Sequence, residues 1–230
     1  MNNKIIIAID AMGGENAPAK NIEGISIFLK KNNEKKDFFF NIYGDENLIV
    51  KEISKFKIST DFYKIFHSST IVSDEETPLT AIKNSRDSSM WNAINSQTEL
   101  NSNITLSAGN TGVLFVVSRM LLKTIESVSK PALAGLWPNK KNMNVVLDLG
   151  ANVECDDKNL VDFAEMGAAL YKALFPEDSA KVALLNIGSE EIKGTENLKK
   201  AYSKLKEISK YGDFQFDGFI EGNKITNGDS

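Results

Sequence analysis

The residues best suited to chemistry lie in a glycine turn between a predicted strand and a predicted helix. Residues 104–106 favour a β-strand, and the apolar run Val113–Val117 favours a buried helix. A helix N-terminus at this place directs free N–H groups and a partial positive charge beyond the strand end, which suits an anion. The alternative is an ordinary connection that uses glycine only for close packing. The residues predicted to bind the anion here are Ser107, Gly109, Asn110, Thr111 and Gly112.

Three further strand ends carry glycine beside acidic, amide or basic residues. The strand predicted at Lys4–Asp10 leads to Gly13 and Gly14, and the strands at Asn144–Leu149 and Lys181–Ile187 lead into similar loops. The carboxyl ends of parallel strands meet at one edge of a sheet, so we expect these loops to share a site with the first turn. The polar residues that the last two loops would contribute are Asp148, Asn152, Asn186 and Lys193.

A basic and hydroxyl-rich cluster is predicted on a long helix that opens after the polar loop Ser73–Pro78. Its apolar positions recur at helical spacing through Met90 and Ala93. The cluster could add charge and hydroxyl donors to the anion site, although a solvated helix face is the alternative. Its members are Lys83, Arg86, Ser88 and Ser89.

Strands and helices alternate along the chain, which predicts an α/β fold with a mostly parallel sheet covered on both faces. A hairpin across residues 139–142 is the exception. We expect one domain over residues 1–230. The predicted strands cover 4–10, 37–43, 62–66, 104–106, 131–137, 144–149, 181–187 and 214–220.

Composition narrows the class of protein. The 230 residues are 42% hydrophobic with a net charge of −4, which argues against a nucleic-acid binder that relies on bulk charge. The single cysteine suits a reducing cytosol. The N-terminal apolar run is too short for a signal peptide, and the apolar stretch Val113–Val117 is too short to cross a bilayer.

Several mechanisms lose support because their motifs are absent. The sequence contains no G-x-G-x-x-G after a strand, no P-loop and no G-x-S-x-G elbow. His67 is far in sequence from any nucleophile, and Cys155 has few activating neighbours, so we interpret both as structural or incidental. What remains is a site that binds phosphate and stabilises an oxyanion without a covalent enzyme intermediate.

At these motifs the chain resembles the bacterial phosphate acyltransferases of phospholipid synthesis, which convert acyl carrier protein thioesters and inorganic phosphate to acyl phosphates. The resemblance runs from the first strand to the last, and the order and spacing of the motifs agree. The matching segments are Ile9–Pro18, Lys83–Met90, Ser107–Gly112, Lys130–Pro138, Leu147–Cys155 and Leu184–Gly194.

This resemblance implies a three-layer α/β/α sandwich similar to phosphotransacetylases and to isocitrate and isopropylmalate dehydrogenases. It also implies a cytoplasmic homodimer without metal or nucleotide cofactor, loosely associated with the inner membrane surface. Its partners would be acyl carrier protein, inorganic phosphate and a downstream glycerol-3-phosphate acyltransferase, with no nucleic acid. Members of the family continue past the position of Ser230. We therefore expect this chain to be incomplete at its C-terminal side.

The resemblance leads to a mechanistic hypothesis. Phosphate lies on the glycine turns, and Lys193, Asn110 and Asn152 assist catalysis, with Asn186 as a further donor. Asp10 and Asp148 either orient lysines or cap loops. A lysine-rich helix face at residues 199–210 either docks acyl carrier protein or is merely solvated. A phosphotransacetylase-like enzyme that uses coenzyme A thioesters and an inactive scaffold protein are the alternative functions.

Overall fold

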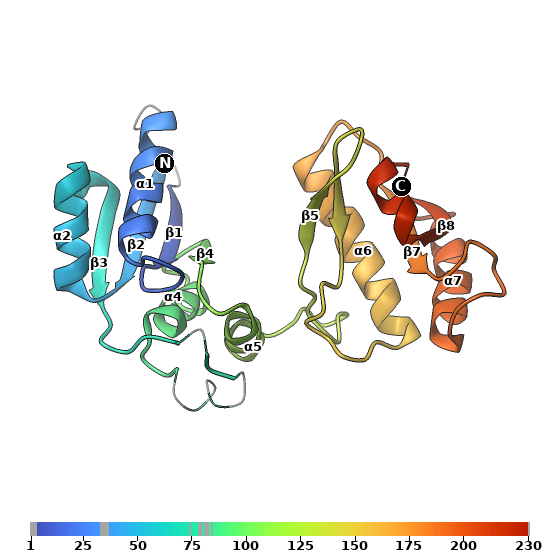
Figure 1. Cartoon of the computed structure of the whole chain (residues 1–230), viewed down its shortest axis with the longest axis horizontal. Helices are drawn as coiled ribbons and strands as arrows, with labels where there is room; N and C mark the ends of the chain where they lie inside the picture. The colour runs from blue at the N-terminus through green and yellow to red at the C-terminus, as the bar shows by residue number, and fades with distance from the viewer. Residues whose placement is uncertain are drawn as a thin grey trace. The chain divides into compact units, whose positions relative to one another are not determined.

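The chain folds into two compact units, each with its own strands, helices and core. The computed structural model describes residues 4–32, 37–73, 75–77, 80, 83 and 85–229. The first unit comprises Met1–Lys123 and the second comprises Thr124–Ser230. Figure 1 shows the first unit in blue to green and the second in yellow to red. A single domain over residues 1–230 stays a prediction, and each unit is described by itself.

The first unit is built on a parallel sheet in which β1 lies between β2 and β4. The strand order is β3-β2-β1-β4, and all three pairings are parallel. Asp10, the last residue of β1, lies beside Tyr43 of β2 on one side and Ser107 of β4 on the other. The strands are β1 (Ile5–Asp10), β2 (Phe38–Gly44), β3 (Tyr63–His67) and β4 (Ile104–Ser107).

Helices cover both faces of this sheet. Side chains alternate between the faces of a strand, so Ile7 and Ile9 of β1 face one layer of helices while Ala8 faces the other. Helices α1 (Ala19–Lys31) and α2 (Glu46–Phe56) share a buried core with Ile7 and Ile9. On the other face, Ala8 packs with Ala93 of α4 (Ser89–Thr98), and α5 (Thr111–Leu122) packs beside α4. A short 3-10 helix, η1 (Thr60–Phe62), precedes β3.

The second unit contains an antiparallel hairpin and a separate parallel strand pair around its own core. Residues of α6 and α7 pack with β7 and β8. Asp156 starts α6 with a capping box, because its side chain accepts from the N–H of Asn159 and the Asn159 side chain accepts from the N–H of Asp156. The elements are β5 (Gly135–Pro138), β6 (Met143–Val146), α6 (Asp157–Leu174), β7 (Lys181–Asn186), α7 (Glu196–Ile208), β8 (Gln215–Glu221) and η2 (Gly222–Asn227).

The predicted α/β class and the mostly parallel sheet are confirmed, and the predicted hairpin is present as β5 and β6. Three predicted extents are wrong. The strand expected over residues 131–137 occupies only Gly135–Pro138, and the strand expected over residues 144–149 ends at Val146. The expected long helix does not run through residues 85–88, because these residues form a turn, Asp87 has a φ of 64°, and Ser88 caps a new helix at Ser89. Residues 78, 79, 81, 82 and 84 of that prediction lie outside the described residues.

Among the described residues, no helix has both the length and the apolar character needed to cross a bilayer. The apolar residues of α5 have another use, because Val113 and Val117 are fully buried and pack with Met90 and Ile94 of α4. This packing matches the expectation that the apolar run in α5 serves the protein core.

Ile42→Ala should lower the free energy of unfolding by about 2–5 kcal/mol, because Ile42 of β2 is fully buried in the core that the sheet shares with α1 and α2, and its loss leaves a cavity. Urea unfolding measures the effect. Ile27→Ala is the matched control, because Ile27 lies on the exposed side of α1, and its effect should stay within about 0.5 kcal/mol. Equal losses in the two variants would contradict this account of the core.

Candidate functional site

The carboxylate of Asp10 is the centre of a buried hydrogen-bond network at the carboxyl end of β1. Asp10 is 2% exposed. Its Oδ1 accepts from the Ser89 hydroxyl at 2.6 Å, and its Oδ2 accepts from the Ser107 hydroxyl at 2.7 Å. The backbone N–H of Met12 also donates to Oδ1 at 3.3 Å. One side chain therefore fastens the ends of β1 and β4 to the first turn of α4.

The glycine loop after β1 packs directly against the turn after β4. A Cβ on Gly13 would lie 2.6 Å from Oδ2 of Asp10 and 2.8 Å from the backbone nitrogen of Gly109. Gly14 has a φ of 89°, and a Cβ there would lie 2.8 Å from the carbonyl oxygen of Ala108. Only glycine fits this close approach of two backbones. The structure thus brings together two of the loops that the sequence assigns to the site.

Two helices begin beside these loops with capped N-termini. The Ser88 hydroxyl accepts from the N–H of Trp91 at the start of α4, and Oδ1 of Asn110 accepts from the N–H of Val113 at the start of α5. The Asn110 amide also donates to the carbonyl of Glu76 at 3.0 Å. Asn110 therefore has a structural role as an N-cap. Thr111 is exposed, and together with Gly112 it forms the first turn of α5, where helix N–H groups have no partner within the helix.

The predicted basic and hydroxyl cluster divides into two parts. Lys83 and Arg86 are exposed, and the Arg86 guanidinium lies 6.0 Å from the ring centroid of Trp91. Ser88 and Ser89 are buried and use their hydroxyls to cap α4 and to bind Asp10. The cluster does not lie on adjacent turns of one helix, because the turn at residues 85–88 interrupts the helical path.

Two features of this unit were missed by the sequence interpretation. The Asn21 amide of α1 donates to the carbonyls of Ala11 and Gly13, at 2.9 and 3.0 Å, and so fixes the first glycine loop. An asparagine in the first turn of a predicted helix, seven residues after a glycine pair, is the sequence signal for this contact. The Ser85 hydroxyl is buried without a hydrogen-bond partner among the described residues, and no sequence pattern indicates that.

In the second unit, Asp148 organises the loop that follows β6. Its Oδ1 accepts from the N–H of Leu133 at 2.8 Å, and its Oδ2 accepts from both the backbone N–H and the side-chain amide of Asn152, at 2.7 and 3.0 Å. Burial acts to raise the pKa of Asp148, but the hydrogen bonds from Leu133 and Asn152 outweigh it and hold the pKa below its ordinary value of 3.8. The Asn152 amide also donates to the carbonyl of Pro131 at 2.8 Å.

Asn186 closes the loop that carries Lys193. Its amide donates to the carbonyl of Lys193 at 3.1 Å, and its Oδ1 accepts from the N–H of Ile187 at 2.9 Å. A Cβ on Gly194, which has a φ of 93°, would lie 2.6 Å from that oxygen. The Lys193 ammonium lies 3.9 Å from Glu190 and stays about half exposed. Asn186 thus fixes the loop, and Lys193 projects from it.

Cys155 and His67 both have positions that argue against catalysis. Burial raises the pKa of the Cys155 thiol, and the nearby Lys130 only partly opposes that effect. A raised pKa leaves less of the reactive thiolate at neutral pH. His67 accepts a hydrogen bond at Nδ1 from the N–H of Glu46, the first residue of α2, at 3.3 Å. This contact gives the histidine a structural role at a helix start.

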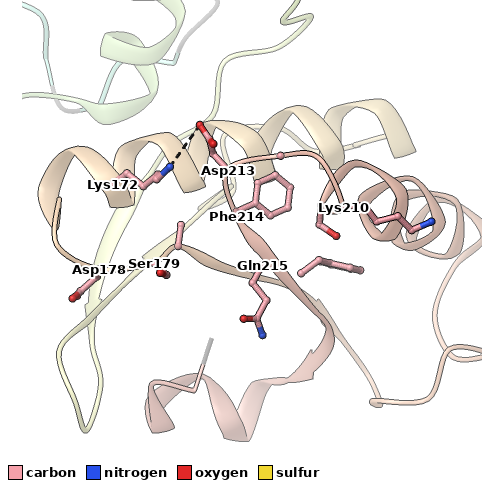
Figure 2. Close-up of a pocket in the computed structure, with 11 residues that line it drawn as sticks. Lys172, Asp178, Ser179, Lys210, Asp213, Phe214 and Gln215 are labelled. Atoms are coloured by element: carbon pink, nitrogen blue, oxygen red, sulfur yellow. Dashed lines mark ion pairs between the residues drawn. The ribbon is translucent and has the colours of Figure 1, made fainter.

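A polar cavity of about 620 Å³ lies where the parallel strands β7 and β8 begin, at the other end from the loops that follow them. Figure 2 shows Lys172 reaching toward Asp213 on one side of it, where the ammonium and carboxylate are 3.6 Å apart, with Gln215 on the other side. The lining residues at the sheet are Ala180, which precedes β7, and Gln215 and Phe216, which begin β8, whereas ligands of parallel sheets bind at the carboxyl ends. None of the sequence-predicted site residues lines this cavity.

Comparison with known proteins places the chain among related sequences. Residues 5–230 match a family described as "Fatty acid synthesis protein". A protein of Pelagibacter ubique (strain HTCC1062) named phosphate acyltransferase is 51% identical over 229 residues, which cover 100% of this chain and 67% of that protein. One of the same name from Maricaulis maris (strain MCS10) is 37% identical over 222 residues, or 96% of this chain and 62% of that protein. The chain thus spans about two thirds of the length of these relatives.

Solved structures agree on the fold. EutD phosphotransacetylase from Staphylococcus aureus has a TM-score of 0.65 at 12% identity, covering 96% of this chain and 69% of that one. A branched-chain phosphotransacylase from Enterococcus faecalis V583 has a TM-score of 0.50 at 15% identity, covering 95% and 67%. The expected similarity to the phosphotransacetylase fold is therefore confirmed.

Gly13→Ala should destabilise the first unit by about 1–3 kcal/mol, because its Cβ would overlap Asp10 and the backbone of Gly109. Gly24→Ala is the control, because a Cβ there meets no atom within 4 Å, and alanine in a helix interior should stabilise by about 0.5–1 kcal/mol. Urea unfolding compares the two variants. A Gly13→Ala protein as stable as the parent would refute the close packing of the two loops.

Asp148→Asn should cost stability at neutral pH, because the neutral amide is a weaker acceptor for the N–H groups of Leu133 and Asn152. The folded-state pKa lies below 3.8, so the ionised carboxylate stabilises the fold fully above about that pH, and the stabilisation is lost as pH falls through the folded-state value. Urea midpoints of parent and variant should therefore converge in acid. A stability difference independent of pH would contradict this role for the charge.

Proposed function

Because the chain belongs to the phosphate acyltransferase family, we propose that it takes part in transferring an acyl group from a thioester to inorganic phosphate. The observation that carries the proposal is the near-complete match of this chain to relatives of that name, a match that includes every strand end assigned to the site. The geometry of the strand ends supports the same chemistry, as the following steps argue.

Phosphate has a suitable place at the start of α5. The turn Ala108–Gly109 is held against the first glycine loop, and Asn110 caps the helix, which begins with the exposed Thr111 and the half-buried Gly112. Unpaired N–H groups and the helix dipole favour an anion at such a position. Arg86, which is exposed near Trp91, supplies a positive charge in the same unit.

The reaction requires positioning and charge stabilisation more than a nucleophilic side chain. One phosphate oxygen attacks the thioester carbonyl, a C–O bond forms, and the carbonyl oxygen takes a negative charge. When the carbonyl re-forms, the C–S bond breaks and the sulfur leaves as thiolate, which later takes a proton from water. A thiol has a reference pKa of about 8.5, so it departs with little help from an acid. Backbone N–H groups and a lysine suffice for the developing oxyanion.

Lys193 is the side chain that we propose for stabilising the oxyanion or the phosphate. It extends from a loop closed by Asn186, and its ion pair with Glu190 at 3.9 Å leaves it about half exposed. An exposed pair of this kind is weak, so the ammonium can leave Glu190 for a substrate at small cost. Asn152 has a supporting place on its own loop, where its amide is held by Asp148 and Pro131.

The acyl donor that we propose is the thioester of acyl carrier protein, as the family resemblance implies. The lysine-rich face at residues 199–210 carries less net positive charge than its sequence suggests, because four of its lysines each lie beside an acid of this chain. The pairs are Lys199 with Glu196, Lys204 with Asp157, Lys206 with Glu191 and Lys210 with Glu207. The homodimer, the membrane contact and the downstream glycerol-3-phosphate acyltransferase stay predictions of that resemblance.

A coenzyme A thioester is the competing donor, since its reactive thioester is the same. Phosphate-dependent thiol release from each donor separates the two cases. Faster release from the acyl carrier protein thioester supports the proposed donor, faster release from the coenzyme A thioester supports the alternative, and no release from either supports an inactive scaffold protein.

Lys193→Ala should reduce phosphate-dependent thiol release by roughly 100-fold, because one preorganised donor contributes about 3 kcal/mol to transition-state stabilisation. Lys224→Ala is the matched control, because Lys224 forms an equivalent pair with Glu221, three residues earlier in the sequence, at the same 3.9 Å. The control should retain the parent rate. Unchanged turnover in Lys193→Ala would remove this lysine from the mechanism.

A further inference from the structure

The loop that carries Lys193 is held to α7 by a hydrogen bond from a tyrosine. This loop, residues 187–195, connects the end of β7 to the start of α7. In its middle, Oε1 of Glu191 accepts from the hydroxyl of Tyr202 at 2.6 Å. The Lys206 ammonium donates to the same oxygen at 3.1 Å and lies 5.5 Å from the centre of the Tyr202 ring. Helix α7 therefore holds the loop two residues before Lys193.

The tyrosine ring has a fixed place on β8. It packs against Phe216 and Phe219, whose ring centroids lie 5.3 and 4.8 Å from its own. Between these two phenylalanines the register of β7 and β8 shifts, and Gly218 has a φ of 84°. A Cβ on Gly218 would lie 3.3 Å from Cε2 of Tyr202, so the strand backbone comes close to the ring. Irregularities of this kind in a strand redirect side chains and are common beside functional sites.

The hydrogen bond from Tyr202 differs from the other polar contacts of α7. Two flexible side chains lose rotamer freedom when they form an exposed ion pair, which makes such pairs weak. The Tyr202 ring has lost that freedom already by packing on the core of the second unit, so its hydroxyl is a fixed donor. The hydrogen bonds from Tyr202 and Lys206 lower the pKa of Glu191, so the acceptor is ionised at neutral pH. A charged acceptor forms a stronger hydrogen bond than a neutral one.

The backbone and the alkyl chain of Lys193 are placed by the rest of the same loop. The N–H of Lys193 donates to the carbonyl of Glu190 at 3.0 Å, and the Asn186 amide donates to the carbonyl of Lys193 at 3.1 Å. The alkyl chain lies against the buried Gly188, where a Cβ would be 3.3 Å from Cδ of the lysine. These contacts leave the ammonium group movable, and its position depends on how firmly the loop is held at Glu191.

We propose that Tyr202 is a positioning residue for Lys193 and acts through Glu191. Packing on β8 fixes the tyrosine ring, and the hydroxyl transfers that fixed position to the loop. The inference rests on the proposed function, in which Lys193 stabilises the oxyanion or the phosphate. Without the hydroxyl, the loop keeps its hydrogen bonds to Asn186, but its middle is released and the ammonium spends less time at the reacting groups. Such a loss matters because a misplacement of about 1 Å can cost roughly 100-fold in rate.

Tyr202→Phe tests the inference, because it removes the hydroxyl and keeps the ring. Amide hydrogen exchange at residues 189–193 should become faster. The kcat of phosphate-dependent thiol release should fall by roughly tenfold, which is less than the loss expected for Lys193→Ala. Tyr171→Phe is the matched control, because the Tyr171 hydroxyl also donates to an acid, Asp178, at 3.2 Å, but near the start of β7. The control should equal the parent in both measurements.

A double-mutant cycle separates positioning from a loss of folded protein. If Tyr202 acts through Lys193, Tyr202→Phe should cost almost nothing further in a Lys193→Ala background. A loss of folded protein would instead reduce the rate by the same factor in both backgrounds. Glu191→Ala removes the acceptor in place of the donor and should reproduce the loss of rate. Glu191→Gln keeps an oxygen that can accept from Tyr202 and should recover part of the rate.

Three outcomes would overturn the inference alone. These are loop exchange in Tyr202→Phe equal to that of the parent or of Tyr171→Phe, equal losses from Tyr202→Phe in the two backgrounds, and equal rates for Glu191→Ala and Glu191→Gln. Unchanged turnover in Lys193→Ala would overturn the proposed role of Lys193 together with the inference. If the parent chain releases no thiol, the proposed function fails, and unchanged loop exchange in Tyr202→Phe would then overturn the inference separately.

Discussion

The buried carboxylate of Asp10 is the interaction on which the first unit's candidate site depends. A charge removed from water must be compensated by hydrogen bonds, and here the hydroxyls of Ser89 and Ser107 provide them at 2.6 and 2.7 Å. These bonds join β1 to α4 and β4, which follow it by 79 and 97 residues at the bonded positions. The loss of either hydroxyl would leave part of the charge unpaired in the protein interior. Asp10 therefore ties β1 to both of the other elements.

This arrangement also limits where the anion of the proposed reaction would bind. With Gly13 pressed against Gly109, the two loops leave no room for side chains between them, and the exposed groups beyond them are the first turn of α5. Of the serines predicted to bind phosphate, Ser89 and Ser107 donate their hydroxyl protons to Asp10, and Ser88 is fully buried with its oxygen accepting from the N–H of Trp91. The donors left for an anion are mainly backbone N–H groups at a rigid helix start, which is how a preorganised anion site is expected to work.

The sequence predicts the helices and strands well because burial of one face gives their apolar residues a regular spacing. Ile22, Ile25 and Leu29 mark α1, and the strand ends of β1 and β4 are correctly assigned to one edge. The same reasoning fails at residues 85–88, where helical spacing continues in the sequence but the left-handed backbone of Asp87 and the cap at Ser88 start a new helix. Nor does local pattern reveal that Asp10 lies beside Ser107, because register is set by pairing between segments 97 residues apart.

In the second unit, too, polar side chains near the strand ends hold loops by hydrogen bonds. Asp148 fixes the loop after β6 by accepting from Leu133 and Asn152, and Asn186 fixes the loop after β7 by bonding Lys193 and Ile187. Most of the short polar side chains at the strand ends therefore form hydrogen bonds within their own loops. From the sequence, these residues are predicted to bind a ligand, whereas in the structure they hold the loops in shape. Lys193 differs from them, because only a weak, exposed ion pair holds its charge. The proposed reaction between phosphate and a thioester depends on rigid backbone donors and a movable charge more than on a nucleophile.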